Sequence, residues 1–417
     1  MNNRRNFLKI AGVGITSAVL NPFHSQSAKL NTKGKKIKVG VLIPQSTENP
    51  FYPQSFLNGL NLGIDQRNAI KNGKIELITE QVNFATPMIV KEKSQKLISE
   101  NNVDIITGIV NSEVVSHVGN LFKNAQLPAI FANAGESYLV NELKQNPFLF
   151  FNTLNLFQAA YESGRYAVNN FGKNVAIITS FYDSGYDSLF TFKQGVESAG
   201  GNAPVTYNAN QNSENFISDT IEKLKLTEPD CIYIFLHGNQ SDEVIRNLHF
   251  ANIKTPLITS AFSTENHRLI NLGEAGNKII SLGSWNKNLQ TKENKNYVEN
   301  YIKKFNKEPD LFATIGFETG QIIYEALSKS NGDFNGLEIA KCMKSIELKS
   351  PRGTIAVNAN SGMIRNKLLV NQTNNSTFSI PENQVIKTII PADEFEEQFA
   401  VLDNEFRSGW LNPYLFV

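Results

Sequence analysis

The sequence has little cysteine and almost no net charge. Only two cysteines occur in 417 residues, which excludes a disulfide framework as the basis of the fold. Lysine and arginine together number 40 against 39 aspartate and glutamate residues, a net charge of +1. A chain this close to neutral is poorly suited to nucleic acid or an anionic membrane, because both attract strongly basic surfaces. We therefore expect no nucleic-acid partner.

Motifs for catalysis, cofactors and metals are also scarce. Gly12-Val13-Gly14 does not follow a strand pattern, so it is not a dinucleotide-binding fingerprint. The sequence contains neither a Gly-x-Ser-x-Gly nucleophile motif nor a phosphate-binding P-loop. The histidines lack paired metal-ligand spacing; they are His24, His117, His237, His249 and His267. We expect a protein that is not an enzyme, with no catalytic residue, no cofactor and no metal.

Long apolar runs are absent as well, and the one near the N-terminus is short. Ile10–Leu20 is too short and too rich in glycine to remain as a membrane span. It follows Asn3-Arg4-Arg5-Asn6-Phe7-Leu8-Lys9 and precedes Ser25-Gln26-Ser27, a small-x-small cleavage pattern. Residues 1–28 thus resemble a twin-arginine export signal. No cysteine follows for an acyl anchor, so we expect a soluble periplasmic protein that does not insert in the membrane after signal removal.

What the sequence does contain is a repeated alternation of strand and helix patterns. Its length points to two domains, and 41% apolar with 19% charged residues is typical of a globular protein. The first region predicts strands at 37–43, 75–79, 103–107 and 128–131, with helices at 54–70, 87–100 and 112–125. The second predicts strands at 174–180, 203–207, 231–236 and 256–260, with helices at 185–199, 214–225 and 240–251. This alternation predicts an α/β fold of two doubly wound lobes with parallel sheets.

The stretch Val103–Ser137 is the most informative for function. Two short apolar runs, 103–107 and 128–131, read as buried parallel strands, and a helix pattern separates them. Polar and small residues follow each strand, at Asn111-Ser112 and at 133–137. Ligands bind outside the carboxyl ends of strands in open parallel sheets, and a helix N-terminus there favours an anionic group. We therefore interpret this stretch as half of a small-molecule clamp.

The remaining segments connect the two regions and complete the chain. The run 148–171 begins like a strand and continues as a helical face, so we expect the chain to cross between the lobes there. The acidic run 393–397 is interpreted as solvated surface, and residues 392–417 form a tail to which we assign no role. After residue 260 we predict strands at 278–285, 354–359, 367–372 and 384–390, and helices at 291–306, 312–330 and 335–347.

Four short motifs together resemble one family in their order and spacing. They are Ile37–Pro44, Val103–Gly108, Asp183–Tyr186 and Ser350–Ile355. The chain resembles the type I periplasmic solute-binding proteins of ABC importers, in the branch typified by the leucine/isoleucine/valine-binding protein, over about residues 36–390. The resemblance implies two lobes joined by a three-crossover hinge. Lobe 1 would comprise residues 37–152 and 286–347, and lobe 2 residues 153–285 and 348–391.

The resemblance also implies a ligand site between the lobes, formed by loops of lobe 1 and by residues of lobe 2. The expected ligand-binding residues are Tyr52, Asn111, Ser112, Asn133, Ala134, Gly135, Tyr186 and His237. Four of them also have a structural interpretation. Asn111 and Ser112 can cap a helix, whereas Tyr186 and His237 can be buried residues of the fold.

One departure from the family pattern concerns the charge of the ligand. The family's amino-acid binders carry an acidic residue after the strand that corresponds to 256–260, where this chain reads Ser260-Ala261-Phe262-Ser263. A buried ammonium group without a counter-charge is costly. Either Glu265 or Glu136 substitutes, or the ligand is not an α-amino acid. Short amides, urea-like compounds, aromatic acids and small organic acids then stay open.

The resemblance therefore implies a monomeric substrate-binding protein that captures a small polar solute, such as an amino acid, an amide or a small organic acid. Its closed form would deliver the solute to an ABC permease in the inner membrane. Two alternatives stay open. One is an exported ligand-binding subunit of a sensory receptor. The other is an exported enzyme with a cofactor, because twin-arginine signals often serve proteins that fold around cofactors before export.

Overall fold

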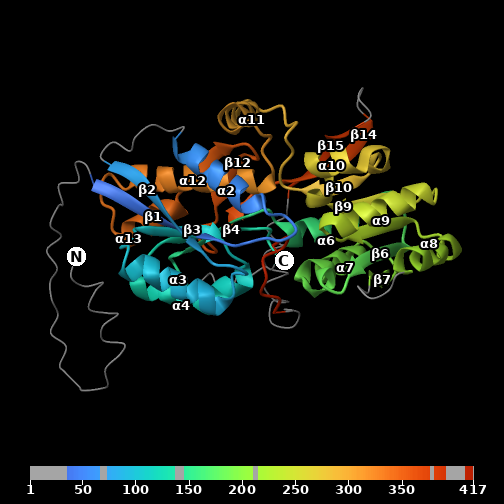
Figure 1. The fold of residues 1–417 in the computed structure, drawn as a ribbon, viewed down its shortest axis with the longest axis horizontal. Helices are drawn as coiled ribbons and strands as arrows, with labels where there is room; N and C mark the ends of the chain where they lie inside the picture. Colours follow the sequence, from blue (N-terminus) through green and yellow to red (C-terminus); the bar gives the residue numbers. More distant parts are fainter. Residues whose placement is uncertain are drawn as a thin grey trace, which may run out of the picture.

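Two separate β-sheets organise the computed structural model, one in each half of the molecule (Figure 1). The structure describes residues 35–65, 73–136, 145–209, 215–375, 380–390 and 409–416. The five-stranded sheet has the order β2-β1-β3-β4-β5, and the seven-stranded sheet has the order β15-β14-β10-β9-β8-β6-β7. We call the halves built on these sheets the first and the second lobe. The predicted pair of α/β lobes is confirmed.

The first lobe alternates strands and helices along the chain, and its strand pairs are all parallel. The strands β3 and β4 are buried along their whole length, as their continuous apolar runs predicted. The predicted helix end at residue 70 lies outside the described residues. The elements are β1 (Lys35–Ile43), α2 (Tyr52–Asp65), β2 (Gly73–Gln81), α3 (Pro87–Ser99), β3 (Ile105–Ile109), α4 (Ser112–Ala125), β4 (Ala129–Asn133) and β5 (Leu149–Thr153).

The second lobe repeats this alternation. Its parallel core is extended by two antiparallel strands, β14 (Leu368–Asn375) and β15 (Pro381–Ile389), which return late in the chain. The short helix α10 (Asn266–Leu272) was not predicted. The other elements are α6 (Leu156–Asn170), β6 (Val175–Ser180), α7 (Asp187–Ser198), β7 (Val205–Ala209), α8 (Phe216–Thr227), β8 (Cys231–Phe235), α9 (Gly238–Phe250), β9 (Leu257–Ser260) and β10 (Ile280–Gly283).

Three further helices and a small sheet lie between β10 and β14 in sequence. The small sheet contacts the first lobe, because Met363 pairs with Phe151 of β5. We therefore propose that the first lobe extends to about residue 365. The predicted helix 335–347 is too long, since Glu347 already begins a strand. The elements are α11 (Lys292–Phe305), α12 (Leu311–Lys329), α13 (Gly336–Lys344), β11 (Glu347–Ser350), β12 (Gly353–Val357) and β13 (Ile364–Arg365).

In each lobe, one helix pair packs backbone against backbone at glycines. In the first lobe, a Cβ added to Gly59 of α2 would lie 2.0 Å from the carbonyl oxygen of Ala313 in α12. In the second lobe, a Cβ on Gly195 of α7 would lie 2.0 Å from the carbonyl oxygen of Tyr161 in α6. No side chain fits at such distances, so these helices interlock closely. Each lobe therefore has a rigid helical seam.

Within the described residues up to 390, the chain passes between the lobes three times, after β5, after β10 and after β13. The buried side chain of Arg352 ties the first two of these passages together. Its Nη1 donates hydrogen bonds to the carbonyl oxygen of Thr153 at 2.7 Å and to Ser284 Oγ at 3.1 Å. Its Nε donates to Glu318 Oε2 of α12 at 2.8 Å, and both charged side chains are fully buried. We call this set of contacts the hinge network.

None of the helices among the described residues is long and apolar enough to cross a membrane. The predicted export signal at residues 1–28 and the acidic run at 393–397 lie outside the described residues.

Candidate functional site

The carboxyl ends of the two sheets face each other across the gap between the lobes. Tyr52 begins α2 at this gap, Asn111 caps α4, and Tyr186 precedes α7. His237 immediately follows β8 and precedes α9. These four residues share contacts with one segment from the end of the chain, residues 409–416, which we call the C-terminal segment. In Figure 1 the end of the chain lies between the two lobes.

The other four predicted ligand-binding residues are Ser112, Asn133, Ala134 and Gly135. They lie at or after the ends of β3 and β4 in the first lobe. The Asn133 side chain donates to the carbonyl oxygen of Val110 at 3.0 Å and to Ser112 Oγ at 3.0 Å. Asn133 Oδ1 accepts a hydrogen bond from the backbone N–H of Gly135 at 3.0 Å. Ala134 is fully buried in the apolar core. These residues therefore shape the rim of the site, and their hydrogen bonds run between its loops.

The first lobe contacts the C-terminal segment through polar groups. Asn111 Nδ2 donates to the carbonyl oxygens of Trp410 at 3.2 Å and Asn412 at 2.9 Å. Its Oδ1 accepts from the backbone N–H of Glu113 at 2.7 Å, so the same side chain also caps α4. The carbonyl oxygen of Leu415 accepts hydrogen bonds from two further side chains of this lobe, Ser46 and Asn49.

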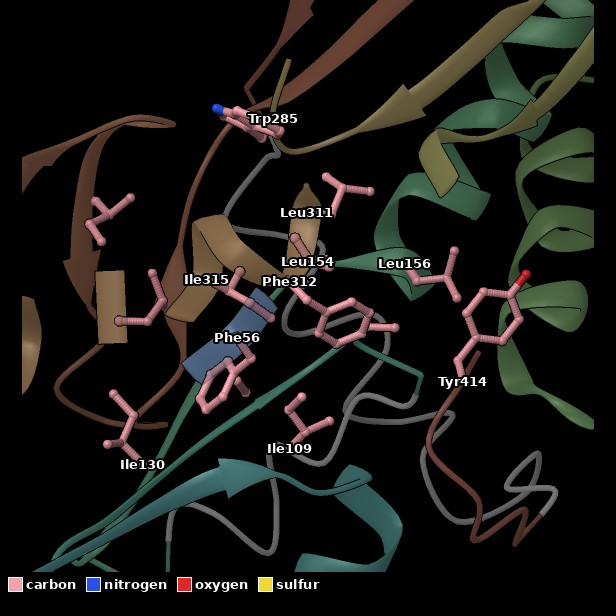
Figure 2. Close-up of a cluster of buried hydrophobic side chains, with 14 of the residues drawn as sticks. Phe56, Ile109, Ile130, Leu154, Leu156, Trp285, Leu311, Phe312, Ile315 and Tyr414 are labelled. Atoms are coloured by element: carbon pink, nitrogen blue, oxygen red, sulfur yellow. The ribbon is translucent and has the colours of Figure 1, made fainter. Parts of the chain in front are cut away.

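The second lobe contacts the same segment through aromatic rings. The ring of Tyr414 packs edge-on against Tyr186 at a centroid distance of 5.0 Å and stacks parallel to Phe235 at 5.9 Å. It also lies 5.5 Å from Phe262 and 5.8 Å from His237. We call Tyr186, Phe235, His237 and Phe262 the ring slot. Tyr414 has no exposed surface, and Figure 2 shows its side chain extending from the C-terminal segment next to Leu156.

Two residues of the ring slot, Tyr186 and His237, also carry polar groups. Tyr186 Oη donates to the carbonyl oxygen of Asn412 at 3.2 Å and lies 2.9 Å from Tyr182 Oη. The His237 Nδ1 lies 2.5 Å from Asp183 Oδ1. Burial lowers the pKa of His237, but the Asp183 carboxylate outweighs it and holds the pKa above its ordinary value. The slot therefore offers an imidazole with a stabilised positive charge and a phenol hydroxyl.

Glu136 is an acidic group inside the cleft. Its Oε1 accepts a hydrogen bond from the backbone N–H of Tyr414 at 3.0 Å, and its Oε2 has no hydrogen-bond partner among the described residues. Burial raises the pKa of Glu136 to about 7, against the backbone N–H groups of Tyr414 and of residues 134–136, which lower it. A buried carboxyl group with an unused oxygen can still accept a ligand's donor.

Glu265, the other acid that the sequence offered, is already engaged. The hydroxyl of Tyr52 donates to Glu265 Oε2, and the backbone N–H of Leu311 donates to Oε1 at 2.8 Å. Burial, reinforced by the Asp310 charge, raises the pKa of Glu265 to about 8. These contacts join the second lobe to α2 and α12 of the first. Glu265 is therefore a contact between lobes, not an open partner for a ligand.

A cavity of about 620 Å³ adjoins this contact between the lobes. Glu265 and Asp310 line it together with Trp285, and no residue of the C-terminal segment does. Among the described residues, no group of three or more His, Cys, Asp or Glu side chains is arranged to hold a metal ion.

Sequence reasoning missed several residues of this site. Phe235 lay inside an apolar strand and read only as core, and Phe262 was interpreted in the same way. Tyr414 was left in the tail without a role. One signal was present: 410–416 contains three aromatic residues and no charge, which is unusual for a solvated tail.

Comparison with known proteins identifies relatives along nearly the whole described chain. Residues 36–377 match the family described as Periplasmic binding protein. A Leu/Ile/Val-binding protein homolog 6 from Brucella suis biovar 1 (strain 1330) is 22% identical over 362 residues, which cover 84% of this chain and 91% of that protein.

Solved structures share the fold at similar identity. An ABC transporter substrate-binding protein from Sphaerobacter thermophilus superposes with a TM-score of 0.77 at 22% identity, covering 85% of this chain and 98% of that one. A solute binding protein of an ABC transporter from Rhodopseudomonas palustris BisB5, in complex with 3,4-dihydroxy benzoic acid, has a TM-score of 0.74 at 21% identity. It covers 87% of this chain and 99% of its own.

Proposed function

The chain belongs to the periplasmic binding protein family, in the leucine/isoleucine/valine-binding branch, and from this premise we propose that it captures an aromatic amino acid between its lobes. The proposal includes delivery of that solute to an ABC permease of the inner membrane by the closed, monomeric protein. It narrows the broader class of small polar solutes by the chemistry of the cleft.

The position of Tyr414 is the observation that carries the proposal. Its ring occupies the ring slot, and its backbone N–H donates a hydrogen bond to the Glu136 carboxyl group. A free amino acid with an aromatic side chain carries the same two groups, with an ammonium in place of the amide N–H. Glu136 would then supply the counter-charge that is missing after β9.

The remaining group of such a solute is its carboxylate. The carbonyl oxygen of Asn412 now accepts hydrogen bonds from Asn111 Nδ2 at 2.9 Å and Tyr186 Oη at 3.2 Å. Both donors lose this acceptor when the segment leaves, and they would then bind the carboxylate of the solute, beside the N-terminus of α4. Two relatives support parts of this chemistry, since one is named for leucine, isoleucine and valine and another holds an aromatic acid.

Ligand-induced stabilisation tests the proposal. Thermal unfolding would be followed with L-tyrosine, with 3-(4-hydroxyphenyl)propionate, which lacks only the amino group, with L-leucine, which lacks the ring, and with 4-hydroxybenzoate. We expect L-tyrosine to raise the unfolding temperature most, since ligand at 100 times its Kd adds about 2.7 kcal/mol of stability. Equal effects of L-tyrosine and the propionate would remove Glu136 from its proposed role. Selective stabilisation by 4-hydroxybenzoate would replace the amino acid by an aromatic acid.

Location and export remain part of the proposal. The family consists of periplasmic proteins, and we propose that residues 1–28 direct export through the twin-arginine route. Replacing both Arg4 and Arg5 by lysine should keep the protein in the cytoplasm, as cell fractionation would measure. Normal export of this double variant would contradict the route without affecting solute binding.

A further inference from the structure

The C-terminal segment occupies the place proposed for the solute, and it belongs to the protein itself. We propose that the cleft is also a peptide-binding site whose ligand is residues 409–416 of the same chain. A competition between the segment and a solute follows, and it rests on the proposed function. If the solute binds in this cleft, the segment has to leave before the solute can enter.

Burial supports a specific site for the segment. Tyr414 and Phe416 have no exposed surface, and Leu415 is 2% exposed. The Phe416 ring lies 5.0 Å from Phe312 of α12 and 6.2 Å from Tyr52 of α2. The segment is thus buried over three successive residues, with the Tyr414 ring in the slot of the second lobe and the Phe416 ring against helices of the first.

The backbone of the segment is recognised as well as its side chains. Carbonyl oxygens of Trp410, Asn412 and Leu415 accept hydrogen bonds from side chains of the cleft, and the N–H of Tyr414 donates to Glu136. The sequence Gly-Trp-Leu-Asn-Pro-Tyr-Leu-Phe carries no charge, so its burial removes no ionised side chain from water. The segment turns at Tyr414 and Leu415, where the backbone N–H of Phe416 donates to the carbonyl oxygen of Pro413 at 3.1 Å. The cleft thus binds a peptide turn through main-chain hydrogen bonds and pockets for its side chains.

The segment leaves part of the cleft unsatisfied. Glu136 Oε2 is buried and has no partner among the described residues, although a ligand ammonium could reach both carboxylate oxygens. The segment also lies outside residues 36–377, the part of the chain that matches the family. It is therefore an addition to a fold that builds its cleft from other residues, and a ligand that also bonded to Oε2 would compete with it for Glu136.

A site that is mostly filled binds a competing ligand weakly. If the segment occupies nine-tenths of the molecules, the apparent Kd for the solute rises about tenfold. The segment then sets a threshold of solute concentration below which the cleft holds its own peptide.

A protease site inserted between residues 400 and 401 allows the test to use the whole folded chain. The protein is purified intact, cut, and separated from its released C-terminal peptide by dilution and filtration. A synthetic peptide of residues 409–417 is then added back, and its binding is followed by the fluorescence anisotropy of Trp410. Only one other tryptophan, Trp285, is present, and it stays with the protein.

We expect the peptide to bind the cut protein saturably, and the uncut protein at least about tenfold more weakly. A peptide with Tyr414→Ala should lose about tenfold or more in affinity, whereas Tyr414→Phe, which keeps the ring, should bind within about threefold of the original. Absence of saturable binding to the cut protein, or equal binding to cut and uncut protein, overturns the proposal.

Solute binding is measured separately on the same samples. If L-tyrosine binds the cut protein about tenfold more tightly than the uncut one, and the added peptide reverses this gain, the competition is supported. If the peptide binds but no solute does, the peptide site stands and the proposed transport function fails. If a solute binds cut and uncut protein equally, the function stands and the competition is overturned.

Discussion

Two of the places where the lobes are held together differ in how completely their polar groups are satisfied. In the hinge network, Arg352 bonds to Glu318, Thr153 and Ser284, and all these partners belong to the part of the chain that matches the family. In the cleft, the lobes meet through the C-terminal segment, and a Glu136 oxygen is left without a partner among the described residues. The difference agrees with our proposal that the hinge network is a permanent connection and that the C-terminal segment is an exchangeable one.

Breaking the hinge network should have the largest effect. Arg352→Met leaves the fully buried Glu318 carboxylate without its partner, which we expect to cost about 3–5 kcal/mol of unfolding free energy. Lys304→Met is the matched control, because Lys304 pairs with Asp65 at the surface and such pairs contribute about 1 kcal/mol or less. Urea unfolding measures both. Equal losses in the two variants would show that the hinge network is no stronger than a surface pair.

The unsatisfied acid of the cleft should make stability depend on pH. Because burial raises the pKa of Glu136 from 4.5 to about 7, the folded protein binds this proton more tightly than the unfolded chain. The contribution of Glu136 to stability is therefore full below about pH 4.5 and is lost as the pH rises through 7.

Glu136→Gln should abolish this dependence. We expect the variant to match the original protein near pH 5 and to exceed it by about 2–3 kcal/mol at pH 8. Glu265 and Asp310, whose pKa values burial raises to about 8 and about 6, titrate in both proteins, so the difference between them isolates Glu136. Chemical unfolding across the pH range measures it, and a difference that does not change with pH would refute this account.

Two helix-capping asparagines allow the contribution of the cleft contacts to stability to be separated from the contribution of capping. Asn111 caps α4 and also binds the C-terminal segment, whereas the exposed Asn335 caps α13 by accepting the backbone N–H of Glu338 at 2.9 Å. Both alanine variants lose a cap, at about 1 kcal/mol. Asn111→Ala should lose about 1–2 kcal/mol more, for two hydrogen bonds to carbonyl oxygens. Equal losses in denaturant unfolding would mean that the segment contributes nothing through Asn111.

The smallest expected effect concerns a single hydroxyl. Tyr186→Phe keeps the ring of the slot and removes the hydrogen bond to the Asn412 carbonyl oxygen. We expect the peptide of residues 409–417 to bind the cut variant about two- to tenfold more weakly, in line with one hydrogen bond of about 0.5–1.5 kcal/mol. Tyr166→Phe, at a half-buried ring outside the cleft, is the control and should leave peptide affinity unchanged.

The fold was largely predictable because its strands and helices have strong local patterns. Buried parallel strands such as Val175–Ser180 and Cys231–Phe235 are continuous apolar runs, and polar turns bound each of them. Both cysteines are buried and free, Cys231 in a strand and Cys342 in a helix. The helix α10 was missed because its seven residues are too few to show a clear period.

The site was predictable only in part, because it combines residues that are far apart in sequence. Asn111 was predicted from the polar residues that follow a strand, and Tyr186 was predicted from the resemblance to the family. The contact between Tyr414 and Glu136 joins residues nearly 280 positions apart, and no local pattern reports such a pairing. Glu136 was recognised only as one of two possible acids, and the choice between them depended on Tyr52 and Leu311, which engage Glu265.

The helix α12 connects the two places where the lobes meet. Its first residue, Leu311, holds Glu265 at the cleft, and Glu318 holds Arg352 at the hinge. The two helical turns between them span about 10 Å, and the glycine seam with α2 keeps this span stiff. Such a helix acts as a lever arm, so each 10° of rotation at Arg352 moves Leu311 by roughly 2 Å. A change of angle at the hinge therefore displaces the cleft end of α12 by a distance large enough to break a hydrogen bond there.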